Sequence, residues 1–350
     1  MAVDPDKLNA TLLRMIGDVA AAASGSLIVL GERLGLFKAL AESGPLTSEA
    51  LAAKLKLTER YVREWLHAMV AGEYVQYDGA RETYSMSPEQ IACLADPDSP
   101  AMIAGGYYGI MSLYLDEPKI EDAFKTGKGV GWGEHHRCLF CGAEKFFGPG
   151  YKANLIDHWL PQLDGVVDKL QRGARVADVG CGHALSTRLM ARAFPNSEFV
   201  GIDSHAPSIA HATELAANWG LSNVRFSTAS SSEFDGSYDL VAFFDCLHDM
   251  GDPTAIARHV RQHLAPGGTW MVVEPAAADE LAHNINPVSR AFYAFSTMVC
   301  VPVSLSQPGR VGLGAQAGAK RLTEVITAGG FGNVRLAASS PTNLVLEARI

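Results

Sequence analysis

An acid and two glycines at the end of a short apolar run constrain this chain more than any other feature. The segment RVADVGCGHALSTRLMA, residues 175–191, passes from an apolar stretch into Asp178, Gly180 and Gly182 and then into a helix-forming stretch. Glycines between a strand and a helix let the backbone approach a ligand and expose N–H groups at the helix N-terminus. The segment therefore predicts a ligand-binding βαβ unit, with an ordinary βαβ unit as the alternative.

The same alternation continues through the C-terminal half. Five short apolar runs alternate with helical stretches around residues 185–194, 206–219 and 253–264, and the tail at 332–350 adds two strands with a hairpin-like edge. Alternating strands and helices predict a parallel sheet with helices on both faces. The five runs are RVADVG, EFVGID, VRFST, YDLVAFFD and TWMVVEP. The fold class is therefore α/β, with a Rossmann-like domain over residues 166–350 and a helical insertion at about 276–320.

A second acid strengthens the prediction of a nucleotide-like ligand. Asp203 follows Gly182 by 21 residues and ends the second apolar run, which is where an acid accepts hydrogen bonds from ribose hydroxyls. Asp178 lies inside the glycine motif, and its carboxylate would repel a pyrophosphate. The pair of acids therefore favours a ligand with an amino group and no phosphates.

The first hundred residues have a different pattern. Amphipathic helical stretches begin after Thr47 and Thr58, which we expect to be N-caps, and an alternating stretch around Asp78-Gly79 predicts a hairpin. Three short helices and a hairpin predict a winged helix-turn-helix over residues 1–100. Residues 101–165 are expected to be a helical linker or lid, with a flexible loop at KTGKGVGWGEHH and a helix break at Gly-Pro-Gly, 148–150.

Residues 166–275 resemble the class I methyltransferases that depend on S-adenosylmethionine (SAM), whose first motif is approximately [VL]-x-D-x-G-x-G-x-G. Asp178, Gly180 and Gly182 match, whereas Ala184 replaces the third glycine and is expected to crowd the helix against the strand slightly. The preceding winged helix makes the chain resemble small-molecule O-methyltransferases of the hydroxyindole and plant caffeic-acid type. LHDMGDP and GLGAQAG are more similar to a bacterial group of winged-helix methyltransferases. The resemblance implies SAM as cofactor and a homodimer formed through the N-terminal domain.

The expected cofactor site gathers residues from the ends of four strands. Asp178 and the glycines would surround the methionine end, Asp203 the ribose, and Asp245 the floor near the methyl group. Many relatives have an acid near the adenine after the third strand, where this chain offers Ser230. The full predicted set is Asp178, Gly180, Cys181, Gly182, Asp203, Ser204, Ser230, Asp245 and Cys246.

His248 is the candidate general base. In the O-methyltransferases that the chain resembles, a His-Asp pair after the fourth strand supplies the base, and here that pair is His248-Asp249. A phenol or alcohol attacks a sulfonium methyl poorly until its proton is removed, and a neutral imidazole suits that step. Glu274 is the expected orienting partner and Asp249 the alternative. A structural histidine remains the competing interpretation, and nitrogen, sulfur or carbon acceptors stay open beside oxygen.

Aromatic residues in the two variable helical regions predict a hydrophobic acceptor pocket. Phe147 and Tyr151 precede the sheet, and Phe292 and Tyr293 lie in the insertion. Aromatics at helical spacing also occur in cores, so core packing is the alternative. Both regions would lie above the carboxyl ends of the strands, where open α/β sheets bind ligands. These four residues are the predicted substrate-binding residues, for a small hydrophobic or aromatic molecule.

The cysteines, the N-terminus and the lengths of the apolar runs bear on where the protein is located, and one segment bears on metal binding. Six scattered cysteines fit a reducing cytoplasm, the N-terminus lacks a signal-peptide pattern, and we find no uninterrupted apolar run of bilayer length. The segment HHRCLFCG, 135–142, offers four metal-ligating side chains, but no second CxxC accompanies it. We therefore expect a cytoplasmic protein with no membrane partner and no metal.

The rival function is a SAM-sensing transcriptional regulator that reads DNA through the winged helix. Residues 1–100 contain nine Lys and Arg against fourteen Asp and Glu, a balance of −5, and the whole chain has a formal charge of −9. The expected recognition helix offers Arg60 and Arg63 beside Glu59 and Glu64. DNA binding needs an excess of cations, so no nucleic-acid partner is expected.

Overall fold

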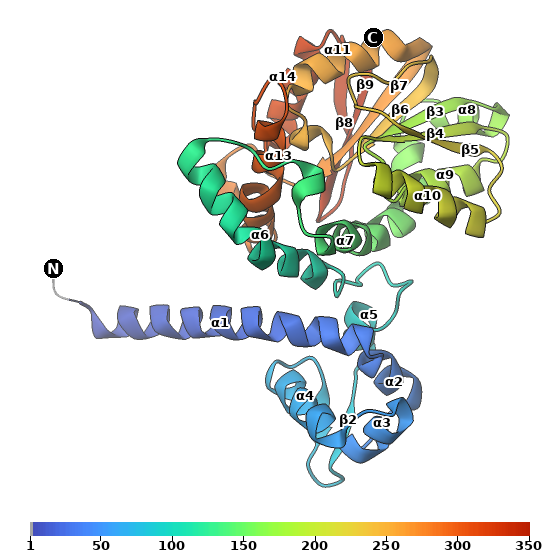
Figure 1. The fold of residues 1–350 in the computed structure, drawn as a ribbon. Helices are drawn as coiled ribbons and strands as arrows, with labels where there is room; N and C mark the ends of the chain where they lie inside the picture. The colour runs from blue at the N-terminus through green and yellow to red at the C-terminus, as the bar shows by residue number, and fades with distance from the viewer. Residues whose placement is uncertain (1–2) are drawn as a thin grey trace. The chain divides into compact units, whose positions relative to one another are not determined.

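The computed structural model describes residues 3–350, which form two compact units (Figure 1). The winged-helix unit takes residues up to Met111 together with Cys141–Pro149, and the sheet unit takes Ser112–Phe140 and Gly150–Ile350. Each unit has its own hydrophobic core. The two units are therefore described separately.

The winged-helix unit has the expected helices and hairpin. The helix Glu59–Ala71 has one buried face, formed by Val62, Leu66 and Met69. The helix before it, Ser48–Leu55, is capped by Thr47 Oγ1, which accepts from Ala50 N at 3.2 Å. Thr58 stands at the N-cap of the next helix without a side-chain cap bond. The elements are α1 (Pro5–Arg33), α2 (Leu36–Ser43), α3 (Ser48–Leu55), α4 (Glu59–Ala71), β1 (Gln76–Asp78), β2 (Thr83–Ser85) and α5 (Pro88–Leu94). The prediction of a winged helix-turn-helix is confirmed.

Two longer helices follow, and one of them corrects an expectation. α6 (Gly106–Thr126) precedes α7 (Cys138–Asn154), and α7 continues through Gly148-Pro149-Gly150, where a break was expected. A proline inside a helix removes one hydrogen bond at a cost of about 3 kcal/mol, which tertiary packing can offset. Such packing is close here, because a Cβ at Gly142 of α7 would lie 2.5 Å from the backbone nitrogen of Gly109 in α6.

The sheet unit contains a seven-stranded sheet in the order β5-β4-β3-β6-β7-β9-β8. The first five strands in this order pair in parallel, and β9 pairs antiparallel with both of its neighbours, β7 and β8. The strands are β3 (Arg175–Val179), β4 (Glu198–Asp203), β5 (Val224–Thr228), β6 (Tyr238–Phe244), β7 (Leu264–Pro275), β8 (Asn333–Ser339) and β9 (Asn343–Arg349). The α/β class and the C-terminal hairpin are confirmed, although β9 lies inside the sheet and β8 forms its edge.

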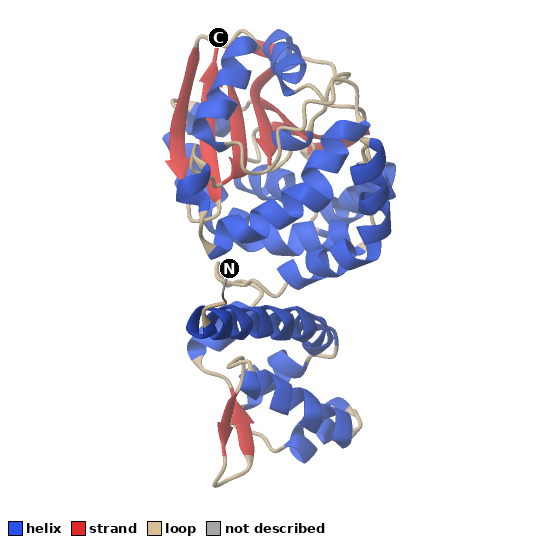
Figure 2. Cartoon of the chain, turned by 90° about the vertical axis from the view of Figure 1, so that its left-hand side faces the viewer, coloured by secondary structure: helices blue, strands red, loops and turns tan. Residues whose placement is uncertain are grey.

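Helices cover both faces of this sheet (Figures 1 and 2). α8 (Val166–Arg172), α9 (Leu185–Ala193) and α10 (Ala206–Asn218) lie on one face, and α11 (Pro253–His263) and α14 (Gly318–Ala328) on the other. The helical insertion comprises η5 (Leu281–Asn284), α12 (Pro287–Phe295), η6 (Ser296–Cys300) and α13 (Val301–Ser306). Shorter turns are η1 (Trp132–Glu134), η2 (Leu155–Trp159), η3 (Leu160–Gln162) and η4 (Leu247–Asp249). The strand order reverses between β4 and β6 on either side of β3, where open α/β sheets bind ligands.

Two helical stretches are long and apolar enough, by length and composition alone, to cross a membrane. They are Pro5–Arg33, with a mean hydropathy of 1.5 over its best window, and Pro287–Ser306, with 1.3. Asp18 interrupts the first stretch and Arg290 the second, so neither is an uninterrupted apolar run of the kind that was sought in the sequence. Of the second window, 44% is buried inside the protein, as in the core helix of a globular domain.

Candidate functional site

Asp178 lies buried near the end of β3 with one oxygen free. Its Oδ2 accepts hydrogen bonds from Ser186 Oγ and Thr187 Oγ1, both at 2.6 Å, from the first turn of α9. Its Oδ1 is buried and has no hydrogen-bond partner among residues 3–350. Burial raises the pKa of Asp178 to about 6, against the lowering effect of the two hydroxyls. A buried acceptor without a partner is costly, so this oxygen is suited to a ligand that donates hydrogen bonds.

The turn after Asp178 is an open, glycine-lined cradle. Gly180 has φ +74°, and a Cβ there would lie 2.7 Å from Cys246 Sγ. Gly182 has φ +54° and open space where a Cβ would point. The backbone nitrogens of Gly180 and Cys181 both donate to Ile202 O, at 2.8 and 3.1 Å, which holds the turn against β4. Burial raises the pKa of the Cys181 thiol well above its ordinary value, so this side chain serves packing.

Ala184 is strained rather than merely crowded. It precedes α9 with φ +59°, in the left-handed region, and it is buried. Only slight crowding was expected at this position from the sequence. A left-handed conformation destabilises an L-residue with a Cβ by about 1–2 kcal/mol, which a glycine at the third position of the motif would avoid.

Asp203 ends β4 and helps to shape the glycine turn. Its Oδ2 accepts from the backbone nitrogen of Gly182, and its Oδ1 accepts from that of His205, both at 2.8 Å. Each carboxylate oxygen has a second lone pair for another donor. Ser204 beside it is exposed, and Ser230, after β5, bonds through Oγ to Ser232 Oγ at 2.9 Å.

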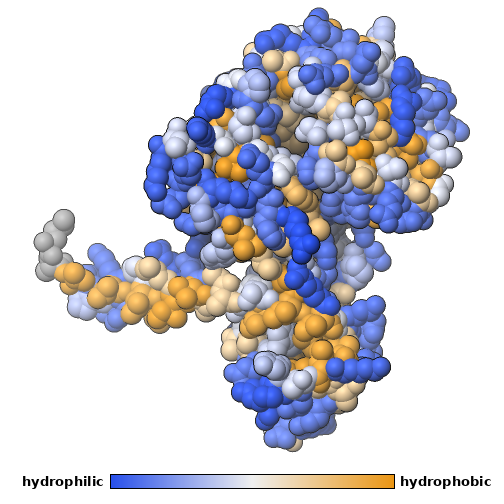
Figure 3. Space-filling model, in the orientation of Figure 1, coloured by the Kyte–Doolittle hydropathy of each residue, from blue (hydrophilic) through white to orange (hydrophobic). Residues whose placement is uncertain are grey.

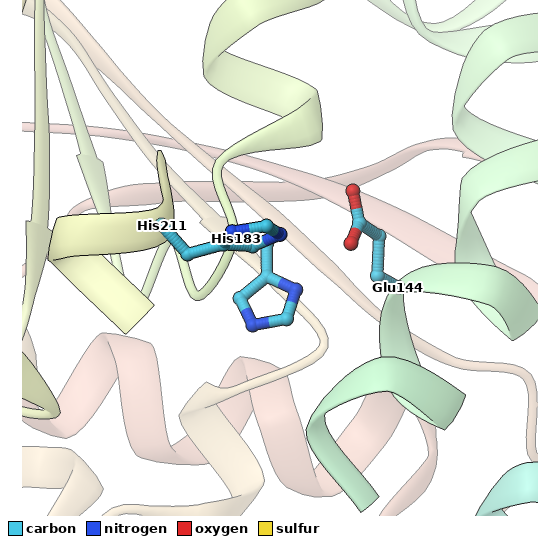
Figure 4. Close-up of side chains that lie close together, drawn as sticks. All are labelled: Glu144, His183 and His211. Carbon is cyan, nitrogen blue, oxygen red and sulfur yellow. The ribbon is translucent and has the colours of Figure 1, made fainter. Parts of the chain in front are cut away.

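Two histidines near this turn were not predicted. His183 lies between Gly182 and Ala184, and its ring centroid is 4.7 Å from that of His211 on α10 (Figure 4). The ring of His205 lies 4.7 Å from the ring of Phe140. His183 and His205 directly neighbour predicted cofactor residues in the sequence, and this adjacency was the available signal. Glu144, also labelled in Figure 4, belongs to the winged-helix unit.

Asp245 follows β6 with φ +50° and has both oxygens engaged. Tyr151 Oη donates to Oδ2 at 2.5 Å, and Asn343 Nδ2 donates to Oδ1 at 2.9 Å. Burial raises the pKa of Asp245 to about 8, while these hydrogen bonds lower it. Burial also raises the pKa of Tyr151 well above its ordinary value, so its phenol keeps its proton. The structure thus brings one of the predicted substrate residues, Tyr151, onto a predicted cofactor residue.

Cys246 lies between the ends of β3 and β6, beside the glycine turn. Its Sγ donates to Val179 O at 3.2 Å. Burial raises the pKa of its thiol well above the ordinary value. This residue is therefore a small neutral wall of the turn.

His248 lies buried in the η4 turn between two carboxylates. Its Nδ1 is hydrogen-bonded to Glu274 Oε2, and Glu274 Oε1 accepts from Leu247 N at 2.8 Å. Asp249 Oδ1 lies 3.2 Å from His248 Nε2. The sequence left Glu274 and Asp249 as alternative partners, and the structure brings both to the ring, one at each nitrogen.

The two carboxylates decide the proton affinity of this ring. Burial alone would lower the pKa of His248, but Glu274 and Asp249 raise it well above its ordinary value. Burial raises the pKa of Asp249 as well. A proton taken up by the ring is therefore strongly stabilised.

The remaining predicted aromatics are distributed between the two units. Phe292 is buried and Tyr293 half-buried on α12 of the sheet unit. Phe147 belongs to the winged-helix unit, where its ring lies 5.0 Å from that of Phe146. Contact of any of these with an acceptor stays a prediction.

The segment HHRCLFCG is joined to the buried carboxylate of Asp116 on α6. His135 Nδ1 lies 3.2 Å from Asp116 Oδ2, and the backbone nitrogen of His136 donates to the same oxygen at 2.8 Å. Burial lowers the pKa of His135 below its ordinary value. Two of the four candidate ligands are thus tied to α6.

Comparisons with known proteins agree with this architecture. A winged helix-turn-helix family model, described as Rv2258c-like, matches residues 22–96, and a methyltransferase-domain model matches residues 170–329. Trans-aconitate 2-methyltransferase of Deinococcus radiodurans is 33% identical over 112 residues, covering 32% of this chain and 42% of that protein. Ubiquinone biosynthesis O-methyltransferase of Xanthomonas oryzae pv. oryzae is 36% identical over 112 residues, covering 31% and 46%. The chain thus spans less than half the length of these curated relatives.

Solved structures match over the whole chain at lower identity. A putative O-methyltransferase from Nostoc punctiforme has a TM-score of 0.69 and 21% identity, with 99% of each chain covered. Human N-acetylserotonin methyltransferase, solved with SAM, has a TM-score of 0.67 and 16% identity, with 97% of each covered. At these identities the likeness shows the fold, and the two family models identify its parts. The chain therefore combines a winged helix-turn-helix domain, matched over residues 22–96, with a methyltransferase domain, matched over residues 170–329.

Proposed function

We propose that this protein binds SAM in the sheet unit and transfers its methyl group to an oxygen of a small hydrophobic or aromatic acceptor. The proposal rests on the free, buried Oδ1 of Asp178 beside the glycine turn. A carboxylate in this position attracts an ammonium group and repels a pyrophosphate. The bound cofactor would supply an electrophilic methyl group on a sulfonium.

The residues of the turn fit this cofactor. Asp178 Oδ1 would accept from the amino group, and the open side of Gly182 would let the ligand approach the backbone. Asp203 would accept from the ribose hydroxyls, with Ser204 beside it and Ser230 towards the adenine. Asp245 and Cys246 would line the floor. Structural neighbours solved with SAM or its product S-adenosylhomocysteine support this assignment.

His248 would act as general base, with Glu274 as its orienting partner. The bond from Glu274 to Nδ1 fixes the ring, and Nε2, which lies 3.2 Å from Asp249 Oδ1, would take the acceptor's proton. The flanking carboxylates stabilise the imidazolium and raise the pKa of the ring, so the neutral base would form only at a pH above the ordinary histidine range. General bases of this kind contribute about 10²- to 10⁴-fold to a rate.

An oxygen acceptor is supported by what the relatives are named for. The names include ubiquinone biosynthesis O-methyltransferase and mitomycin 7-O-methyltransferase. Phe147, Tyr151, Phe292 and Tyr293 remain the proposed acceptor-binding residues. Of these, Tyr151 has the strongest support, because its hydroxyl reaches Asp245 on the predicted floor.

Calorimetric titration with S-adenosylhomocysteine and with NAD, on the wild type and on Asp203→Ala, tests the cofactor. We expect micromolar binding of the first ligand alone, weakened by the substitution. Binding of NAD, or of neither ligand by a folded protein, would contradict the proposal.

We also propose that the protein is a cytoplasmic homodimer paired through α1. Six apolar side chains on this helix are more than half exposed, and Figure 3 shows apolar surface along it. They are Leu8, Leu12, Leu13, Met15, Ile16 and Val19. All six cysteines are free, which fits a reducing compartment.

Light scattering of the wild type and of Leu12→Lys/Ile16→Lys tests the pairing. We expect a dimer mass for the first and a monomer for the second. A wild-type monomer that floats with liposomes would assign the apolar face of α1 to a membrane instead.

DNA binding is disfavoured by the charges of α4. Arg60 Nη1 lies 2.5 Å from Glu64 Oε2, and Arg63 Nε lies 3.1 Å from Glu59 Oε1. Both arginines are thus partly neutralised within the helix. A SAM-sensing regulator would need these cations for phosphate contacts.

A further inference from the structure

The helical insertion brings a cysteine to the proposed base. Cys300 ends η6, which continues directly into α13, and α13 packs against the η4 turn that holds His248. His248, Asp249 and Cys300 each offer one ligand atom, and these three atoms all lie within 4.8 Å of one another. All three residues belong to the sheet unit. Three different metal-ligating side chains therefore converge on one small volume.

The acidic member of this cluster is Asp249, and one of its carboxylate oxygens is available to a ligand. Asp249 Oδ1 is buried and has no hydrogen-bond partner among residues 3–350, although it lies 3.2 Å from His248 Nε2. When the ring is neutral with its proton on Nδ1, Nε2 and Oδ1 face each other as two buried acceptors without a donor, which is costly. A cation between the two atoms would remove that cost.

The histidine is oriented as metal-binding histidines usually are. Glu274 holds Nδ1 and leaves Nε2 directed towards Asp249. A carboxylate on the distal nitrogen fixes the ring and raises its basicity as a ligand. Glu274 thus has the place of an outer partner in a carboxylate–histidine–metal arrangement.

We propose that His248 Nε2, Asp249 Oδ1 and Cys300 Sγ bind a zinc-class divalent ion. Imidazole, carboxylate and thiolate are the ligands that zinc takes in proteins, and three protein ligands with an open fourth position are typical of reactive sites. Binding replaces the S–H proton of Cys300, which leaves to solvent, by a sulfur–metal bond. The sequence analysis expected no metal, because it considered only ligands near one another in the sequence.

The ion would regulate the proposed methyl transfer. His248 Nε2 is both a ligand of the ion and the atom that would take the acceptor's proton, so it cannot do both. Zinc is therefore expected to inhibit turnover. This consequence rests on the proposed function, whereas ion binding itself does not.

Cobalt(II) titration of the metal-free full-length protein tests the site without any activity measurement. A thiolate–cobalt charge-transfer band in the near ultraviolet is expected, and zinc should abolish it by displacement. Cys300→Ser should lose the band, whereas the matched control Cys141→Ser, at an exposed cysteine, should keep it. Absence of the band in the wild type, or its survival in Cys300→Ser, would overturn the proposal.

Two further measurements separate this site from the proposed function. S-adenosylhomocysteine binding in the presence of a chelator reports on the cofactor site alone and should be equal in the wild type and Cys300→Ser. Zinc should inhibit methyl transfer by the wild type, and Cys300→Ser should need at least about tenfold more zinc. Equal inhibition of both proteins would count against this site, even if methyl transfer itself is established.

Discussion

Two carboxyl groups end neighbouring parallel strands of the sheet unit, and their surroundings differ. Asp178 on β3 has one oxygen held by two hydroxyls and the other without a partner. Asp245 after β6 has one oxygen held by Tyr151 and the other by Asn343. Burial raises both pKa values, to about 6 and about 8 respectively. Burial alone therefore does not mark a ligand site, whereas an oxygen left without a donor does.

The same distinction separates the two ends of the proposed active site. At the Asp178 end the protein leaves an acceptor for the cofactor, and at the His248 end it surrounds the ring with carboxylates. The Asp178 end is arranged to bind the proposed cofactor, and the His248 end is arranged to stabilise a positive charge on the imidazole ring. Substitutions at the two ends should consequently affect different measurements.

His248→Gln should give the largest effect, confined to turnover. Loss of a general base lowers the rate by about 10²- to 10⁴-fold, while glutamine keeps a donor for Glu274. Turnover would be measured with the best acceptor from a panel of phenols and hydroxy acids. Affinity for S-adenosylhomocysteine should stay within about threefold, and unchanged turnover would remove the base assignment.

Asp178→Asn should lower cofactor affinity with little effect on folding. A hydrogen bond to a charged group contributes about 1.5–3 kcal/mol, which corresponds to about 10- to 100-fold in the dissociation constant of S-adenosylhomocysteine. Ser186 and Thr187 can still donate to the asparagine oxygen. Calorimetry and thermal unfolding of the same variant measure the two effects.

Asp245→Asn is the matched comparison for that variant. An asparagine with its oxygen at the Oδ2 position keeps Tyr151 Oη and Asn343 Nδ2 as donors. Its NH2 group then replaces Oδ1 and faces Asn343 Nδ2, donor against donor, at a cost of about 1–3 kcal/mol. Its unfolding free energy should therefore fall more than that of Asp178→Asn. The reverse order of stabilities would undo the contrast between the two carboxyls.

The pH dependence of cofactor binding should single out Asp178. Its carboxyl pKa is raised to about 6 in the free protein, so the group is ionised at pH 7.5 and increasingly protonated below 6. An ammonium ligand binds the ionised form, so the affinity should fall about tenfold between pH 7.5 and pH 5. Asp178→Asn should show a flat profile over this range, and an equally steep one would place the titrating group elsewhere.

Sequence reasoning predicted the fold where the signals are local. Asp178, Gly180, Gly182 and Asp203 belong to one strand-turn-helix-strand unit, and turn geometry restricts which residues fit it. The hydroxyls of Ser186 and Thr187 were within reach of the same reasoning, because they stand in the first turn of the following helix. The parallel sheet was predictable because its apolar runs alternate with helices.

Contacts between distant segments were beyond that reasoning. Asn343 reaches Asp245 across 98 residues and Tyr151 reaches it across 94, and no periodic pattern encodes such pairs. The approach of Cys300 to His248 depends in the same way on how the insertion folds back. The uninterrupted α7 depends on close packing at Gly142, which outweighs the local preference of Gly-Pro-Gly.

The smallest expected effect concerns Gly182 and Ala184, two of the three residues of the turn that have a left-handed backbone. Gly182→Ala introduces a Cβ into open space at φ +54°, so its cost is the conformational one of about 1–2 kcal/mol. Ala184→Gly relieves the same strain, but it loses a buried methyl group worth about 0.8 kcal/mol and adds backbone entropy to the unfolded chain.

These opposing terms should leave Ala184→Gly within about 1 kcal/mol of the wild type, whereas Gly182→Ala is destabilised. For a unit of this size 1 kcal/mol shifts the melting temperature by about 2–4 °C, which scanning calorimetry resolves. A loss of stability in Ala184→Gly larger than that in Gly182→Ala would mean that packing of the Ala184 methyl group, and not strain, dominates at the third position of the motif. The turn would then be adapted to alanine, and its left-handed backbone would be held by the buried contacts of that side chain.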